Sequence, residues 1–344
     1  MGAMRVAVVG ATGAVGREML RILEERSFPV DELIPLASER SAGSRVRFAG
    51  RDHTVGVLSL EALRGVDVAL SSCGSTVAKT WIPEAASAGT VCIDNSSAFR
   101  MDPDAALTIP EVNPESLASK PRIVSVPNCT IITTLMAVAP LHREAGLRSL
   151  ILSSYQSVSG AGQKGVRELA EQIEKLRGME DELGHPDPSA LPVGEVFGKT
   201  IAYNVVAKID VFDEETGSTF EEIKMHREAR RILSMPDLEF AATCVRVPVP
   251  VGHSVSIHAA FSRPITPDRA REVLSAAPGV EVRDDPANGV YPSPLEAAGR
   301  DEVLVGRIRQ APGRDDALLL FSCGDNLRKG AALNAVQIAE HLFS

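Results

Sequence analysis

The sequence predicts an α/β fold in two domains, and three observations predict it. The chain of 344 residues is longer than one hydrophobic core usually organises. Up to about residue 145, short apolar segments alternate with amphipathic helical patterns, which is typical of a doubly wound parallel sheet. Beyond residue 147 the apolar segments are longer and alternate with polar residues. That change predicts a C-terminal α+β domain with a mixed, largely antiparallel sheet.

The first element is a predicted buried strand over residues 4–9, followed by a glycine-rich turn and a helix through Arg26. The turn carries Gly10, Gly13 and Gly16. Glycine lets a backbone approach a pyrophosphate, and a helix N-terminus stabilises its negative charge. The position after a first strand therefore predicts a Rossmann-type dinucleotide site, with a plain tight turn as the alternative.

The second strand should end near Ala37, before the segment SERSAG. A site that prefers NAD usually carries an acid here for the ribose hydroxyl. Arg40 and Ser41 instead suit a 2′-phosphate, which favours NADP. Glu39 leaves open an NAD-type site, in which its carboxylate binds the ribose hydroxyl. The alternative for Arg40 is an arginine that faces solvent and binds no ligand.

Cys129 follows an apolar run that ends in Pro127-Asn128, and an amphipathic helical pattern begins at this cysteine. A helix N-terminus favours the thiolate, the form of cysteine that attacks carbon. Asn128 can donate a hydrogen bond to an oxygen that develops negative charge. The alternative is a small buried cysteine with Asn128 as the helix N-cap.

The segment SSYQSVSGAGQKG ends a predicted strand in a glycine-rich loop. Gln156 is a polar side chain at the strand end, and Ser159, Gly160 and Gly162 offer backbone donors near a nicotinamide or its ribose. Taken alone, the same segment is also compatible with an ordinary turn.

Several charged residues stand where they could meet an anion. Arg246, in CVRVPVPVGHS, suits bidentate capture of a carboxylate, and His253 in the same segment is a natural proton carrier. Glu221 and Lys224 lie one helical turn apart, on one face, and Arg100 follows a strand end. The alternative for His253 is a structural histidine whose hydrogen bonds are met within the fold. For the acid–lysine pair it is a surface ion pair, and for Arg100 it is an arginine that faces solvent.

Composition sets limits on partners. Apolar residues make up 44% and charged residues 24%, with a net charge of −9 and no long block of one sign. This argues against nucleic acid as a main partner, although local arginines can still select an anionic substrate. Five cysteines without paired spacing or a zinc-like cluster predict neither a disulfide framework nor a metal site. Four of them lie in or just after apolar strands and are expected to be small buried residues: Cys73, Cys92, Cys244 and Cys323. Without a signal-like or membrane-spanning segment, we expect a cytoplasmic protein with no membrane partner.

The domain division follows from these patterns. We expect a nucleotide-binding domain over residues 1–132, completed by a C-terminal helix over 326–344 that packs back on it. Residues 133–325 are expected to form the second domain, to which a family resemblance assigns catalysis and dimerisation. Residues 178–199, rich in glycine, proline and acids, are predicted to be a surface excursion.

With these pieces in order, the chain resembles aspartate-semialdehyde dehydrogenase over essentially its whole length. Eight segments in the family's order carry the resemblance: VVGATGAVG, ASERSAG, IDNSSAFR, VPNCTI, SSYQSVSGAG, EEIKM, CVRVPVPVGHS and GDNLRKGAALNAVQIAE. So many motifs in one order make a chance match implausible. The excursion over 178–199 fits the variable region of the family, and no function is assigned to it.

The resemblance implies catalytic roles. Cys129 matches the nucleophile that becomes an acyl-thioester, His253 the acid/base catalyst, and Gln156 the residue that orients substrate and intermediate. Arg246 matches the arginine that holds the α-carboxylate, and Glu221 the acid near the α-amino group. Glu222 is adjacent to Glu221. Only the spacing to Lys224 decides which of these two acids is the ligand of the α-amino group.

The resemblance also implies two binding sets. The phosphate site is matched by Arg100, Asn128 and Lys224. The NADP contacts are matched by Thr12, Gly13, Ala14, Val15, Arg40, Ser41, Ser159, Gly160 and Asn326.

The implied reaction is the NADP-dependent reductive dephosphorylation of β-aspartyl phosphate to aspartate semialdehyde, in the biosynthesis of lysine, diaminopimelate, methionine, threonine and isoleucine. The family forms homodimers, sometimes dimers of dimers, through the sheet of the second domain. One alternative is N-acetyl-γ-glutamyl-phosphate reductase, whose substrate has no free α-ammonium, so Glu221 disfavours it. The other is a catalytically silent NADP-binding sensor, which has no reason to keep Cys129, Gln156, Arg246 and His253 together.

Overall fold

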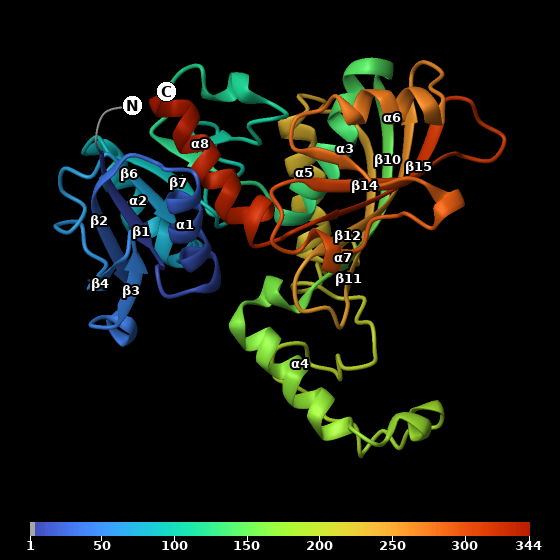
Figure 1. Ribbon diagram of the computed structural model, residues 1–344, viewed down its shortest axis with the longest axis horizontal. Coiled ribbons are helices and arrows are strands. Elements are labelled where there is room, and N and C mark those ends of the chain that lie inside the picture. Colours follow the sequence, from blue (N-terminus) through green and yellow to red (C-terminus); the bar gives the residue numbers. More distant parts are fainter. Residues whose placement is uncertain (1–3) are drawn as a thin grey trace. The chain divides into compact units, whose positions relative to one another are not determined.

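The computed structural model describes residues 4–344, and residues 1–3 lie outside the described part. The chain divides into two compact units, whose elements are labelled in Figure 1. The first unit combines the chain up to Pro140 with Arg227–Asp237 and Leu327–Ser344, and the second combines Leu141–His226 with Leu238–Asn326. The boundary predicted at residue 132 lies inside helix α3 (Cys129–Ala145), shortly before this division.

The first unit is built on a parallel sheet of seven strands in the order β5-β2-β1-β6-β7-β9-β8. The strands are β1 (Met4–Val9), β2 (Val30–Ala37), β5 (Gly56–Val57), β6 (Val68–Ser71), β7 (Val91–Asp94), β8 (Ala106–Leu107) and β9 (Ile123–Ser125). A separate hairpin pairs β3 (Arg45–Phe48) with β4 (Arg51–Thr54). The chain runs to opposite sides of β1, so the strand order reverses there and ligands are expected at its carboxyl end. The predicted Rossmann-type sheet is confirmed.

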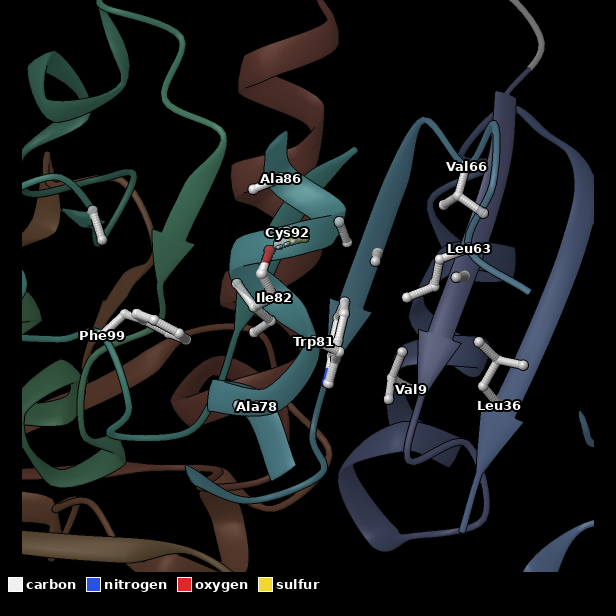
Figure 2. Packing of buried hydrophobic residues seen from close by; sticks show 14 residues of the cluster. Val9, Leu36, Leu63, Val66, Ala78, Trp81, Ile82, Ala86, Cys92 and Phe99 are labelled. Atoms are coloured by element: carbon white, nitrogen blue, oxygen red, sulfur yellow. Dashed lines mark hydrogen bonds between the residues drawn. The ribbon is translucent and has the colours of Figure 1, made fainter. Parts of the chain in front are cut away.

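Two helices follow the first and fourth strands of this sheet in chain order, α1 (Ala14–Glu25) and α2 (Ser75–Ser87). Figure 2 shows how α2 packs on the sheet. Trp81 and Ile82 of α2 are buried together with Val9 of β1, Leu36 of β2 and Cys92 of β7. These side chains come from three strands of the sheet, so the apolar contact holds α2 against the sheet.

The C-terminal helix α8 (Leu333–Phe343) belongs to the first unit. It follows a π-helical turn, Arg328–Ala332. Arg26, just after α1, donates to Glu340 of α8 at 2.8 and 2.7 Å. Arg328 reaches Glu18 and Glu25 of α1 at 3.0 and 2.5 Å. Two sets of ion pairs therefore tie the last segment to the first helix.

The second unit contains a six-stranded sheet in the order β11-β10-β12-β15-β14-β13. The strands are β10 (Leu147–Gln156), β11 (Glu239–Arg246), β12 (His253–Phe261), β13 (Val280–Val282), β14 (Val303–Gln310) and β15 (Ala317–Gly324). The two outer pairs are parallel and the inner pairs antiparallel. The predicted mixed, largely antiparallel sheet is confirmed. Its helices are α4 (Gln163–Leu176), α6 (Pro267–Ser275) and the short α7 (Pro294–Ala297), together with the first part of α5 (Phe220–Ile232).

The segment after α4 is the predicted excursion over residues 178–199. Figure 1 shows α4 and this segment projecting from the sheet of their own unit. Most of its side chains are exposed, as predicted. Phe197, near its end, is only partly exposed, because it packs against a cluster that includes Leu169 and Leu176 of α4 and Ile201.

Candidate active site

The glycine-rich turn opens directly into α1. Gly10 has φ +87°, and a Cβ there would lie 2.6 Å from the carbonyl oxygen of Ser72. A Cβ on Gly16 would lie 2.2 Å from the carbonyl oxygen of Gly10. These two glycines are therefore required by the turn itself.

Gly13 differs, because it is exposed and stands at the N-cap of α1, where no side chain of the described residues caps the helix. Thr12, Ala14 and Val15 flank it and are partly exposed. The first N–H groups of α1 are thus accessible to a ligand, and this open helix start fits a nucleotide pyrophosphate.

The second strand ends at Ala37, as predicted, and a short 3-10 turn over Glu39–Ser41 follows. Arg40 and Glu39 are both exposed there, and Ser41 is partly exposed. The turn therefore offers both a cation for a 2′-phosphate and a carboxylate for a ribose hydroxyl.

Cys129 is the first residue of α3 and is partly exposed. Asn128 caps this helix, since its Oδ1 accepts the N–H groups of Thr130 and Ile131 at 2.9 and 3.3 Å. Both sequence readings of Asn128 are therefore compatible: the oxygen caps the helix, and only the amide nitrogen can donate to a ligand.

Arg100 lies in the same unit and is held by three acceptors. Its Nε donates to the carbonyl oxygen of Val126 at 2.9 Å, and its Nη2 donates to that of Asn95 at 2.9 Å. Its Nη1 donates to Glu228 at 3.0 Å. The second carboxylate oxygen of Glu228 accepts the backbone N–H of Asn128 at 2.7 Å. The structure thus brings Arg100, Asn128 and Cys129 together around one buried glutamate.

The second unit gathers three other predicted residues at one edge of its sheet. Gln156 and Arg246 end the parallel strands β10 and β11, and they are paired in register. His253 begins β12, which runs antiparallel to β10, so it lies at the same edge. All three side chains are buried. Buried polar groups gathered in this way are suited to binding a polar ligand.

His253 is held through Nδ1, which accepts the backbone N–H of Ser157 at 3.1 Å. Its Nε2 is buried and has no hydrogen-bond partner among the described residues. Burial, with the charge of Arg246 as a second cause, keeps the pKa of His253 well below its usual value. The ring is therefore neutral at neutral pH.

Arg246 donates from Nη1 to the carbonyl oxygen of Ser157 at 2.6 Å, and its guanidinium lies over the ring of Phe197, 5.8 Å from the centroid. A pocket of about 390 Å³ lies beside it, lined by Phe197, Lys208 and Asp210 among others. A cation at the wall of a small pocket suits a carboxylate ligand.

The two adjacent glutamates of α5 have different partners. Glu222 accepts the backbone N–H groups of Thr219 and Cys244, at 2.7 and 2.9 Å, so it caps its own helix and ties it to β11. Glu221 is buried, and Gln156 donates to it at 3.4 Å. Geometry therefore places Glu221, not Glu222, beside Gln156. Lys224 is paired with Asp210 at 2.5 Å.

The loop after β10 forms a polar cluster with Asn326. Ser159 and Asn326 are buried and hydrogen-bonded to each other at 3.0 Å. A Cβ on Gly160 would lie 2.7 Å from Nη1 of Arg246 and 3.4 Å from Nε2 of His253. Glycine is thus required at 160 because two site residues approach its backbone.

The predicted residues therefore form two groups, each within one unit. The first group comprises Gly10, Thr12, Gly13, Ala14, Val15, Arg40, Ser41, Arg100, Asn128 and Cys129. The second group comprises Gln156, Ser159, Gly160, Glu221, Lys224, Arg246, His253 and Asn326.

Four residues with direct contacts to these groups were not predicted: Ser157, Phe197, Asp210 and Glu228. Glu228 lies two helical turns beyond Glu221, a spacing that places both on one side of α5 and could have drawn attention to it. Sequence spacing carries no comparable signal for the other three, because their contacts come from distant segments.

Neither Cys129 nor any of the remaining cysteines forms a disulfide. Cys92, Cys244 and Cys323 are buried, as predicted, and burial raises the pKa of each to about 12. Cys73 was also predicted to be buried, and that prediction was wrong: it is partly exposed, because it stands just beyond the end of β6. Burial still raises its pKa.

Within residues 4–344, no group of three or more His, Cys, Asp or Glu side chains is arranged to hold a metal ion. No helix of that described part is long and apolar enough to cross a membrane.

Two family models match the chain. The model described as semialdehyde dehydrogenase, NAD binding domain, covers residues 5–120, and the model of the semialdehyde dehydrogenase dimerisation domain covers residues 138–329. The chain therefore carries a pyridine-nucleotide-binding domain.

Relatives match over nearly the full length. Aspartate-semialdehyde dehydrogenase of Aquifex aeolicus is 48% identical over 98% of this chain and 97% of its own, and that of Bacillus subtilis is 45% identical with the same coverage. The crystal structure of aspartate semialdehyde dehydrogenase II from Vibrio cholerae has a TM-score of 0.91 at 41% identity, covering 99% of this chain and 98% of its own. A second structure of that Vibrio cholerae protein is complexed with ASA.

Proposed function

This chain belongs to the aspartate-semialdehyde dehydrogenase family, and on that premise we propose that it works through an acyl-thioester on Cys129. The reaction is the reductive dephosphorylation of β-aspartyl phosphate to aspartate semialdehyde. One observation carries the assignment: Cys129 is the partly exposed first residue of a helix capped by Asn128. The helix start favours the thiolate, which attacks the acyl carbon.

Asn128 stabilises the oxygen of the tetrahedral intermediate. Its Oδ1 accepts two N–H groups of α3, so the side chain is oriented, and its amide nitrogen is the group that we expect to donate to the oxyanion. A donor fixed before the reaction costs no reorganisation as charge develops.

The substrate is held by groups of opposite charge. Arg246 binds the α-carboxylate beside its pocket, and Glu221 binds the α-ammonium. Gln156, which donates to Glu221, orients the substrate between these contacts. The Vibrio cholerae relative complexed with ASA supports a substrate of this class.

The leaving phosphate is bound by Arg100, Lys224 and Asn128. Arg100 and Lys224 are each paired with a carboxylate, Glu228 and Asp210, so neither presents its full charge to a ligand. Such neutralised cations bind phosphate through directed N–H groups and still release it. The site is thus suited to an anion that must leave in each cycle.

His253 carries the proton at each tetrahedral stage. Its ring is neutral, and its Nε2 has no partner among the described residues, so it can meet a substrate oxygen. NADP, when bound, supplies the hydride.

The residues that would hold the nucleotide fit this role. The open start of α1 over Thr12–Val15 takes the pyrophosphate, and Gly10 shapes the turn before it. Arg40 and Ser41 take the 2′-phosphate, which selects NADP over NAD. Ser159, Gly160 and Asn326 lie next to His253 in the loop cluster, where a nicotinamide must sit to serve the proposed reaction.

We assign nucleotide binding to residues 1–132 with 326–344, and catalysis and dimerisation to residues 133–325. A homodimer would cover the exposed apolar side chains of β10, where Ile151 and Tyr155 are 48% and 38% exposed. Five cysteines without a disulfide fit a cytoplasmic, reducing location.

The test is phosphate-dependent reduction of NADP by aspartate semialdehyde, followed by nicotinamide absorbance. Activity that requires phosphate and is lost in Cys129→Ala, but kept in Cys73→Ala, supports the assignment. Substantial activity in Cys129→Ala excludes the covalent route. If the folded protein binds NADP and is inactive with aspartate semialdehyde but active with N-acetyl-γ-glutamyl phosphate, it catalyses the alternative reaction.

A further inference from the structure

Glu168, on α4, uses both of its carboxylate oxygens on one stretch of the excursion. Oε2 accepts the backbone N–H of Val196 at 2.7 Å, and Oε1 accepts that of Phe197 at 3.2 Å. Hydrogen bonds to an ionised acceptor are stronger than neutral ones. The backbone passes so close that a Cβ on Gly194 would overlap the same carboxylate. Glu168 therefore fixes the chain at the residue that carries the Phe197 ring.

The ring itself contacts both α4 and the proposed substrate site. Gly165 lies one helical turn before Glu168, and a Cβ there would lie 3.1 Å from Cζ of Phe197. The ring thus occupies the space that this glycine leaves on the helix. The guanidinium of Arg246 lies over the same ring, 5.8 Å from its centroid. One face of α4 therefore sets where the ring meets the arginine.

The chain beyond the ring is anchored as well. Gln172, one helical turn after Glu168, accepts the backbone N–H groups of Ile201 and Ala202 at 2.7 and 3.2 Å. Val206 then pairs with Arg246 through two backbone hydrogen bonds, at 2.9 and 2.8 Å. The segment that carries the ring is therefore held by α4 at one end and by the strand of the arginine at the other.

This stretch of the excursion forms part of the pocket beside Arg246. Four consecutive residues, 195–198, line the pocket of about 390 Å³. The guanidinium is also confined from the loop after β10, because a Cβ on Gly160 would lie 2.7 Å from its Nη1. A side chain held in place before a ligand arrives loses less conformational freedom on binding. The position of residues 195–198 should therefore affect how tightly Arg246 binds its ligand.

We propose that Glu168 is a positioning residue for substrate binding: it holds Val196 and Phe197 so that the ring lies against Arg246 and completes the pocket. The proposal rests on the proposed function, in which Arg246 binds the α-carboxylate. The excursion is then part of the substrate site, and α4 is its support. Because the α-carboxylate takes no part in the reaction, this contact is equally strong in the ground state and the transition state. Its loss raises KM and leaves kcat nearly unchanged.

The test is Glu168→Ala, which removes both acceptors and leaves α4 intact. We expect KM for aspartate semialdehyde to rise about fivefold, with kcat and KM for NADP changed less than about twofold. Glu168→Gln keeps one acceptor oxygen and should recover part of the KM. Glu171→Ala, an exposed change on the same helix, is the matched control and should have the parental KM. A parental KM in Glu168→Ala, or a loss confined to kcat, overturns the proposal.

A double variant shows whether Glu168 acts through the ring. If it does, Glu168→Ala combined with Phe197→Leu raises KM about fivefold, no more than either single change, because both remove the same contact. Independent effects would multiply to about 25-fold. That outcome would assign Glu168 a role unrelated to Phe197 and would contradict the proposal.

Backbone hydrogen exchange gives a readout that does not depend on turnover. The amides of Val196 and Phe197 should exchange faster in Glu168→Ala than in the parent, because their acceptor is lost, whereas Glu171→Ala should keep the parental rates. Equal exchange rates in the parent and Glu168→Ala overturn the proposal. Failure of the proposed function looks different, because the parent protein itself would then lack phosphate-dependent activity.

Discussion

Glu228 accepts the backbone N–H of Asn128 at 2.7 Å, one residue before the helix start at Cys129. The other oxygen of this carboxylate accepts Arg100 at 3.0 Å, and its side chain is 1% exposed. One buried acid on α5 thus fixes both the turn that carries the thiol and the guanidinium proposed to meet phosphate. A buried pair of this kind is costly to break from one side, because the remaining charge stays buried.

Replacing this acid tests its effect on Arg100. Glu228→Gln keeps the shape and an acceptor oxygen for Asn128 but removes the charge that neutralises the guanidinium. The free energy of unfolding should fall by about 3 kcal/mol, measured by urea denaturation. Added phosphate should raise Tm more in the variant than in the parent, because the anion replaces the lost charge. Equal phosphate shifts would remove Arg100 from the anion site, and Glu115→Gln, an exposed change in the same unit, is the control.

Phe197 should affect substrate binding through Arg246, on which its ring lies. Phe197→Leu keeps an apolar side chain but removes the ring face. A cation–π contact of about 1 kcal/mol predicts a KM for aspartate semialdehyde raised roughly fivefold, with kcat changed less. Steady-state kinetics measures this, with Val193→Ala as the control, since Val193 belongs to the same excursion and is 71% exposed. A parental KM in Phe197→Leu would show that the ring does not position Arg246.

The buried His253 should make stability depend on pH in one direction. Its pKa lies well below the usual value of 6.5 because of burial first and the charge of Arg246 second. Below about pH 6.5 the unfolded chain therefore binds a proton that the folded chain does not. Stability should be unaffected by this residue above pH 7 and should fall by up to about 1.4 kcal/mol per pH unit below 6.5. Urea denaturation of His253→Gln at pH 7.5 and 5.5 should show a smaller loss than the parent, and an equal loss would contradict the argument.

Lys329 is a structural cation whose removal should destabilise the first unit. Its side chain is 1% exposed, and its Nζ donates to Glu111, Asn334 and Gln337 at 2.6, 3.0 and 2.8 Å. Lys329→Met removes the cation beside a largely buried carboxylate, so unfolding should become easier by about 3–5 kcal/mol. The double variant Lys329→Met with Glu111→Leu should recover part of this loss in urea denaturation. No recovery would mean that the cost is not electrostatic.

Local elements of the fold could be predicted from the sequence, whereas contacts between distant segments could not. The strand over 4–9, its end-of-strand turn and the helix start at Cys129 follow from periodicity and from residues such as Gly10 and Asn128. Gln156, Arg246 and His253 each stand in a local motif from which a site residue is predicted. Their meeting at one edge depends on the register of β10 with β11 and β12, which no local pattern encodes.

The residues missed from the sequence all act through such distant contacts. In the sequence, Ser157 looks like an ordinary serine in a turn. Its contact with His253 of β12, through its backbone N–H, is visible only in the structure. Glu228 looks like one more acid on an exposed helix until Arg100 and Asn128 reach it. Side chains of this kind have common residue types and no special spacing, so only the tertiary structure separates them from solvated neighbours.

The first unit draws on three separate stretches of the chain, the last of them Leu327–Ser344. Arg328 and Glu340 in that last stretch form ion pairs with Glu18, Glu25 and Arg26 around α1. The ion pairs around α1 can therefore form only after the C-terminal stretch has reached it. They require a loop that spans nearly the whole chain to close first. The second unit, by contrast, is complete by Asn326. During synthesis the second unit can be completed while α1 still lacks its C-terminal partner, so nucleotide affinity should emerge as one of the last events of folding.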